Sequence, residues 1–348
     1  MKSFLKRILR ILYSIQKKVW IRLSILVVKS IKPKLFLAYN AEKVRDGVGA
    51  QFHRILSISL VSFLFNLRMV RPHIEDITIH PLDPIQDPIN LQGYLDEWNS
   101  RVFASKEYVS RASEERNCKN VYFDSLTLRR LVQISIKSYF IKQPIIIYIN
   151  DSHAISDYYV EKYRLAIQFF FTEFLEFLQL PNHSSELIVH YRQGSGGFAI
   201  HPGQSLPRQM SINSVISAVE DVASSKIHRI SVLRLFTDSP KNSFIFNPIE
   251  SQIHLWQNMP GFDGKSVVNE SSGVENYLSP IAKKRNLIFV IDRDVDAFQM
   301  IVAMARSEAL IMSRSSLSYV GGIFNMHGEV FYPQGFWHTK LRKWKAYN

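Results

Sequence analysis

Two stretches of the sequence carry polar side chains that could bind a phosphate. In the first, residues 187–191 have the apolar pattern of a short buried strand, and His190 and Arg192 lie at its end, just before Gly194. An arginine presents a planar fork of donors, and glycines let backbone N–H groups approach a ligand closely. This pattern predicts an anion site; the alternative is a strand-end arginine that only makes a structural ion pair.

The second stretch, residues 309–322, has the same design. An apolar strand over 310–312 precedes a hydroxyl-rich turn and the start of a helix. Hydroxyls and free N–H groups at a helix N-terminus form a second anion cradle, although a plain serine N-cap is also compatible with the pattern. Two cradles that each follow a strand suggest one diphosphate bound from two sides. The residues of this cradle are Ser313, Ser315, Ser316 and Ser318.

These stretches resemble motifs of the fucosyltransferase superfamily, which has the GT-B fold. His190-x-Arg192-x-Gly194 is similar to its His-x-Arg-Arg motif, and the serine run 313–318 resembles its late motif. A third stretch near the N-terminus, residues 46–52, is similar to its Gly-x-Gly-Asn-Gln loop, with Gly47, Gly49 and Gln51 in place. The resemblance covers about residues 36–325. It departs from the family at Gln193, Ser195 and Ala50, which bears on the identity of the sugar.

The resemblance implies two Rossmann-like domains that face a cleft. It also implies an inverting, metal-independent transfer of a sugar, with fucose from GDP-fucose as the expected donor. Arg192 would then stabilise the negative charge that grows on the leaving diphosphate. Asp238 or Asp296 would read the nucleotide, because a carboxylate accepts from the N–H groups of guanine.

The motifs do not identify a general base or a metal site, but a few further residues could serve in these roles. Asp46 and His53 are candidates for the general base, but a packed helix histidine is the favoured interpretation of His53. Asp292 and Asp294 form an Asp-x-Asp that could hold a divalent metal; acids just before a helix also serve as caps. We expect no metal and no cofactor besides the nucleotide sugar.

Charge is concentrated at the N-terminus. The 348 residues carry a net charge of +13, and residues 1–34 contain ten lysines and arginines with no acid. The remainder is therefore nearly neutral, which argues against a nucleic-acid partner. A basic amphipathic helix over 1–34 that lies on an anionic membrane surface fits best, and a helix packed on its own protein is the alternative. We accordingly expect a cytoplasmic protein, peripheral on the inner face of a membrane.

Cys118 is the single cysteine of the chain, so the protein cannot form an internal disulfide.

The order of elements predicts an α/β fold in two domains. Residues 34–70 read as strand, glycine turn, helix and strand, residues 145–149 as a buried strand, and residues 157–180 as a long aromatic-rich helix whose phenylalanines belong to the core. The second half alternates again from residue 187. A polar stretch at 181–185 is a natural linker. The expected parts are the basic helix 1–34, an acceptor-side domain over 35–181 and a donor-binding domain over 182–348.

The sequence therefore predicts a GT-B-like glycosyltransferase that moves a sugar from a nucleotide diphosphate to a glycan or lipid-linked acceptor. One alternative is a transferase for another nucleotide sugar. The other is a membrane-docked nucleotide-binding module without turnover.

Overall fold

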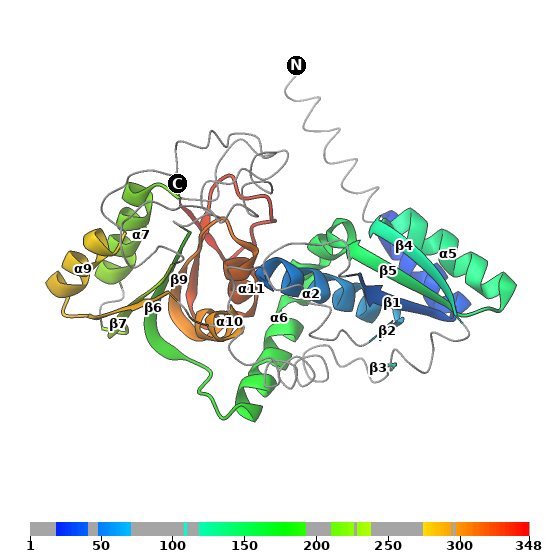
Figure 1. Cartoon of the computed structure of the whole chain (residues 1–348), viewed down its shortest axis with the longest axis horizontal. Coiled ribbons are helices and arrows are strands. Elements are labelled where there is room, and N and C mark those ends of the chain that lie inside the picture. The colour runs from blue at the N-terminus through cyan, green and yellow to red at the C-terminus, as the bar shows by residue number, and fades with distance from the viewer. Residues whose placement is uncertain are drawn as a thin grey trace, which may run out of the picture. The chain divides into compact units, whose positions relative to one another are not determined.

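The protein is an α/β chain with two parallel sheets (Figure 1). The computed structural model describes residues 19–40, 48–70, 108–109, 118–192, 210–225, 228–237, 274–293, 295 and 297–347. These fall into two compact units. The first contains 19–40, 54–70, 108–109 and 118–162, and the second contains 48–53 and the described residues from 163 onward. The predicted α/β class with parallel strands is confirmed.

The sheet of the first unit has the strand order β3-β2-β1-β5-β4, and every pair is parallel. Its strands are β1 (Leu35–Tyr39), β2 (Arg68–Val70), β3 (Tyr108–Val109), β4 (Lys119–Ser125) and β5 (Ile145–Asp151). Both β1 and the apolar part of β5 are buried, which explains their unbroken runs of apolar residues. Cys118, just before β4, is partly buried and is not part of a disulfide.

Two helices, α2 and α5, connect strands of this sheet, and two others precede β1 and follow β5. Residues 19–31 are helical, α2 runs over Val48–Phe65, α5 over Leu128–Ile141 and α6 over His153–Phe177. Helix α5 begins at an N-cap, Thr127, whose side chain accepts from the N–H of Arg130, and ends at Lys142 in the left-handed conformation. The long helix predicted over 157–180 is α6, and the described aromatic residues Phe171 and Phe174 are buried as expected.

The sheet of the second unit has the order β11-β10-β9-β6-β7-β8, again fully parallel. Its strands are β6 (Ser184–Tyr191), β7 (Val232–Thr237), β8 (Ile288–Asp292), β9 (Ser307–Ile311), β10 (Glu329–Pro333) and β11 (Lys345–Tyr347). Figure 1 shows α7 (Ile212–Ser225) and α9 (Glu275–Lys284) on one side of this sheet, and α10 (Ala297–Arg306) and α11 (Ser316–Phe324) on the other. The strands expected at 187–191 and 310–312 are confirmed as β6 and β9.

The helix at residues 19–31 packs on its own unit. Ile21, Ser24 and Val28 are at most 2% exposed. Their spacing places them on one face of the helix. The packed-helix interpretation therefore holds for this face, and the opposite face remains exposed. None of the helices in the described part of the chain has the length and apolar character needed to cross a membrane.

Two neighbouring glycines of α11 differ in what surrounds them. A Cβ on Gly321 would lie 2.6 Å from the Cβ of Met304 in α10, whereas a Cβ on Gly322 would meet only side-chain atoms at 3.2–3.3 Å. Gly321 therefore sets how closely α10 and α11 approach.

We expect Gly321→Ala to destabilise the protein by about 1–3 kcal/mol, because the methyl group overpacks the contact with Met304. Gly322→Ala is the matched control; it gains the same helix propensity, about 1 kcal/mol, and meets only movable atoms. Chemical denaturation of both variants measures the difference. Equal stability of the two variants would contradict this account of the packing.

Candidate functional site

One hydrogen bond joins the two stretches that the sequence singles out. Ser313 Oγ lies 2.9 Å from Nδ1 of His190, and both side chains are buried. The bond can form because β6 and β9 are neighbouring parallel strands in which Val189 pairs with Ile311. The residues that follow these two strands consequently meet at the carboxyl edge of the sheet, where parallel α/β sheets bind ligands.

The serine turn is held by its own hydroxyls. Ser315 is the N-cap of α11 and accepts from the N–H of Leu317 at 3.3 Å. Ser318 is fully buried, and its hydroxyl donates to the carbonyls of Ser313 and Ser315. Ser315 and Ser318 thus shape the turn, and the geometry gives Ser318 no accessible hydroxyl for the direct donor contact that the sequence suggested.

Ser316 is held by a histidine that sequence reasoning missed. Nε1 of Trp337 lies 3.1 Å from Nε2 of His338, and an indole N–H can only donate. Nε2 of His338 therefore carries no proton. Ser316 Oγ, 3.0 Å from the same nitrogen, must donate its hydroxyl hydrogen to it. The Ser316 oxygen is then left as an acceptor for an O–H or N–H of a ligand.

His338 lies within a cluster of aromatic rings. Its ring centroid is 4.3 Å from that of His53, 4.5 Å from that of Tyr319 and 5.0 Å from that of Phe336. His53 in α2 is 2% exposed, so the structure supports the packed helix histidine rather than a base open to solvent. The sequence signal for this cluster is the run of aromatic residues and histidine at 336–338, close to the C-terminus.

The glycine motif near the N-terminus also lies at this edge of the sheet. It forms the first turn of a helix there, not a loop. We expected a loop through Gly47 and Gln51; α2 already begins at Val48, so Gly49 and Gln51 lie in its first turn. A Cβ on Gly49 would stand 2.6 Å from the Cα of Leu317, so glycine is required by close approach rather than by a loop. Gln51 is fully buried. Gly47 lies outside the described residues.

Two tyrosines fix the segment that carries His338. The hydroxyl of Tyr332 donates to the carbonyls of Phe336, at 3.0 Å, and of His338, at 2.5 Å. Tyr319 donates to the carbonyl of Thr339 at 2.8 Å. Burial raises the pKa of Tyr332 to about 12, against the opposing effect of nearby Arg314. The phenol therefore remains a donor throughout the physiological pH range.

Arg314 binds a backbone carbonyl of its own unit. Its guanidinium donates to the carbonyl of Gln334 from Nε, at 3.0 Å, and from an Nη, at 2.8 Å. Burial lowers the pKa of Arg314, with Tyr347 and Tyr332 acting in the opposite direction. Arg314 therefore ties the serine turn to the segment after β10.

Arg192 follows β6 directly and is partly buried, next in the chain to the strand that carries His190. The structure thus brings His190, Ser313 and Ser316 to the edge from which Arg192 extends. The other expected site residues lie outside the described residues: Asp46, Gly47, Gly194, Asp238 and Asp296.

Asp292 has an ion-pair partner. Its carboxylate lies 2.5 Å from an Nη of Arg234, which also contacts Glu186 at 2.9 Å. Burial lowers the pKa of Arg234, but the hydrogen bonds and charges of these two carboxylates outweigh it, so its pKa is raised overall. Asp292 thus serves an ion pair that crosses β6, β7 and β8. Asp294 lies outside the described residues.

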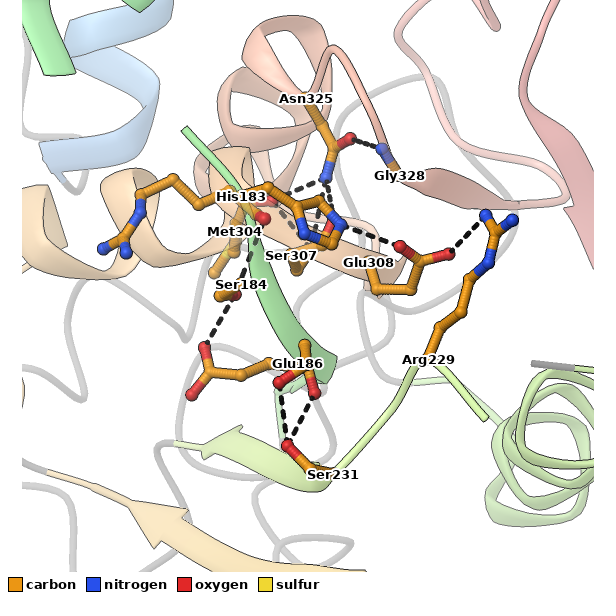
Figure 2. Close-up of polar contacts among 12 residues, drawn as sticks. His183, Ser184, Glu186, Arg229, Ser231, Met304, Ser307, Glu308, Asn325 and Gly328 are labelled. Atoms are coloured by element: carbon orange, nitrogen blue, oxygen red, sulfur yellow. Dashed lines mark hydrogen bonds and ion pairs between the residues drawn. The ribbon is translucent and has the colours of Figure 1, made fainter. Parts of the chain in front are cut away.

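A second polar cluster occupies the opposite, amino edge of the same sheet (Figure 2). His183 Nε2 lies 2.7 Å from the carboxylate of Glu308, which is 5% exposed, and Arg229 lies 3.8 Å from the other oxygen. With His327 these residues line an open pocket of about 550 Å³. Among the described residues, no group of three or more His, Cys, Asp or Glu side chains is arranged to hold a metal ion.

Comparison with known proteins gives matches in structure alone. No family model matches the sequence, and no curated protein matches it. Crystal structures of POFUT1 in complex with GDP-fucose and with GDP align with 90% of this chain and 96% and 98% of theirs, at 9% and 8% identity and TM-scores of 0.44 and 0.46. The E. coli heptosyltransferase WaaC with ADP aligns over 90% of this chain and 92% of its own, at 10% identity and a TM-score of 0.35.

We expect the ring nitrogens of His338 and His183 to show opposite tautomers. His338 should carry its proton on Nδ1, because Nε2 accepts from Trp337. His183 is the internal control: its Nε2 faces a carboxylate and must carry a proton. Nitrogen NMR of the histidine rings near neutral pH distinguishes the two forms. A proton on Nε2 of His338 would contradict the assignment of Ser316 as donor to it.

Tyr332→Phe should cost about 1–3 kcal/mol near neutral pH, because two buried carbonyls lose a donor. The pKa of Tyr332 is raised to about 12 in the folded protein, from an ordinary tyrosine value of about 10, so its contribution is complete below about pH 10 and is lost as the pH rises towards 12. The stability difference between wild type and variant should therefore shrink by about 1.4 kcal/mol per pH unit between pH 10 and pH 12. Denaturation at several alkaline pH values measures this; a constant difference would argue against burial as the cause.

Proposed function

We propose that this protein is a GT-B-like glycosyltransferase that transfers a sugar from a nucleotide diphosphate donor, with GDP-fucose the first donor to test. The acceptor in this proposal is a glycan or a lipid-linked glycan. The transfer inverts the anomeric centre and needs no metal ion.

The observation that carries the proposal is the His190–Ser313 hydrogen bond. It brings two stretches that were each identified as an anion cradle, 123 residues apart, to neighbouring strand ends. A diphosphate at this edge would be within reach of the N-terminus of α11, whose first N–H groups are natural anion donors. The resemblance to the fucosyltransferase superfamily rests on these same residues.

In this proposal each residue has a defined task. Arg192 stabilises the leaving diphosphate, because a fixed guanidinium interacts more strongly as charge develops. His190 positions Ser313, and Ser316 accepts a hydrogen bond from a hydroxyl or N–H of the donor. Asp238 or Asp296 reads the base, Gly194 lets the backbone approach the phosphates, and Asp46 is the candidate base.

Two alternatives remain as outcomes of the tests: a transferase for a different nucleotide sugar, and a nucleotide-binding module without turnover. We further propose that residues 1–34 attach the protein to the anionic inner face of a membrane as a peripheral cytoplasmic protein. This attachment would suit a lipid-linked acceptor.

A donor at about 100 times its Kd should stabilise the folded protein by about 2.7 kcal/mol. We expect a thermal-shift screen of nucleotide sugars to find such a donor, and the shift to persist in excess chelator. A shift that disappears with chelator and returns with Mg²⁺ or Mn²⁺ would contradict the metal-independent mechanism. Stabilisation by nucleotides without any transfer or hydrolysis would favour the binding module.

Arg192→Ala should lower turnover about 10²–10³-fold, because a preorganised donor to developing charge is lost. Arg192→Lys should restore little, since an ammonium cannot reproduce the bidentate fork. Arg229→Ala is the matched control: this arginine belongs to the same unit but lines the pocket at the amino edge, and its side chain is 62% exposed. Turnover, donor affinity and melting temperature are measured for all three. Unchanged turnover in Arg192→Ala would refute the mechanism.

A further inference from the structure

Helix α5 buries two serines beside one leucine and exposes large apolar residues towards its C-terminal end. Its buried residues are Leu131, Ser135 and Ser138. Its exposed side includes Tyr139, 56% exposed, and Phe140, 75% exposed. A surface helix normally buries its apolar stripe and exposes its polar one. Two buried serines and two aromatic rings in solvent are therefore the arrangement expected of a helix whose outer face is covered by a further apolar partner.

The buried serines are satisfied inside the unit, so they need no rearrangement. Ser135 Oγ donates to the carbonyl of Leu131 at 2.8 Å, and Ser138 Oγ donates to the carbonyl of Lys34 at 3.2 Å. Small side chains that make such bonds let a helix lie close to its neighbours without large apolar residues. The orientation of α5 is thus fixed by its inner face, and the aromatic residues remain outside.

The helix at residues 19–31 also exposes large apolar residues, although Ile21 and Val28 on its inner face are buried. Ser24 is 2% exposed and donates to the carbonyl of Trp20 at 2.8 Å. Trp20, Leu23 and Leu26 are 50–62% exposed. Of the fifteen large apolar side chains that are exposed in the described part of the chain, five lie on this helix and four on α5.

The charges on these helices have one sign. Residues 128–141 contain Arg129, Arg130 and Lys137 and no acid, and residues 19–34 likewise contain only cations. Exposed aromatic and aliphatic residues together with lysine and arginine are the composition of helices that lie in a lipid interface. A two-fold contact between two copies of α5 would instead bring like charges together, which disfavours a second copy as the partner.

We propose that α5 is a second lipid-binding element, which together with the helix at residues 19–31 docks the protein on an anionic membrane surface. The proposal rests on the membrane attachment proposed above for residues 1–34 and adds α5 to it. The lipid-facing residues of α5 are Ile136, Tyr139, Phe140 and Ile141, flanked by Lys137. The Ser138–Lys34 hydrogen bond ties the end of α5 to the segment that leaves the N-terminal helix.

The experiment is co-sedimentation of the full chain with vesicles of phosphatidylcholine alone, or of phosphatidylcholine mixed with phosphatidylglycerol. We expect the wild type to bind the anionic vesicles and to be released by salt. Tyr139→Ser/Phe140→Ser should reduce binding by about tenfold or more, because two rings no longer enter the interface. Lys137→Glu should reduce it on the order of 25-fold, about fivefold for each unit of charge changed.

Tyr277→Ser is the matched control, an exposed tyrosine of α9 in the second unit, and it should bind as the wild type does. Leu23→Ser/Leu26→Ser tests the N-terminal helix separately. If this variant loses binding while the α5 variants keep it, the attachment of residues 1–34 stands and the α5 proposal fails. If the α5 variants instead abolish a concentration-dependent dimer and bind vesicles normally, the partner is a second copy and the proposal also fails. Unchanged melting temperatures confirm that each variant is folded.

Discussion

The parallel pairing of β6 with β9 is the constraint on which the rest of the second unit depends. Both strands are buried at the centre of a six-stranded sheet, and their register sets which side chains meet beyond their ends. His190 and Ser313 meet only because Val189 pairs with Ile311. A shift of one residue would turn every side chain of a strand to the opposite face, so the burial of both faces keeps the site in register.

Around this pairing, the outer part of the site is held by hydrogen-bonded aromatic residues. Tyr319 of α11 and Tyr332 of β10 both donate to carbonyls of the segment 336–339, and Trp344 packs on both rings. This arrangement fixes His338 and, through it, the direction of the Ser316 hydroxyl. Polar groups that are held by buried neighbours lose little entropy when a ligand binds, which would suit the donor site proposed above.

The two edges of the sheet have different chemistry. The amino edge holds the His183–Glu308 pair and the backbone contacts of Asn325, in which the polar groups satisfy one another. The carboxyl edge holds hydroxyls and imidazoles at a helix N-terminus. The helix at residues 19–31 and α5 in the first unit add a third surface, where large apolar side chains and cations are exposed together. Donor recognition and membrane attachment, as proposed, thus fall on separate parts of the chain.

The sequence by itself determined the α/β class, the long helix α6 and the strands β1, β5, β6 and β9, because long apolar runs and helical periodicity are local signals. It also selected His190 and Ser313 before any contact was known. It did not predict α5, α9, β10 or β11, whose short or irregular apolar patterns carry little local signal. Tertiary structure alone decided the role of His338, the helical position of Gly49 and the buried serines of α5. Each of these depends on a neighbour distant in sequence: Ser316 for His338, Leu317 for Gly49, and the carbonyl of Lys34 for Ser138.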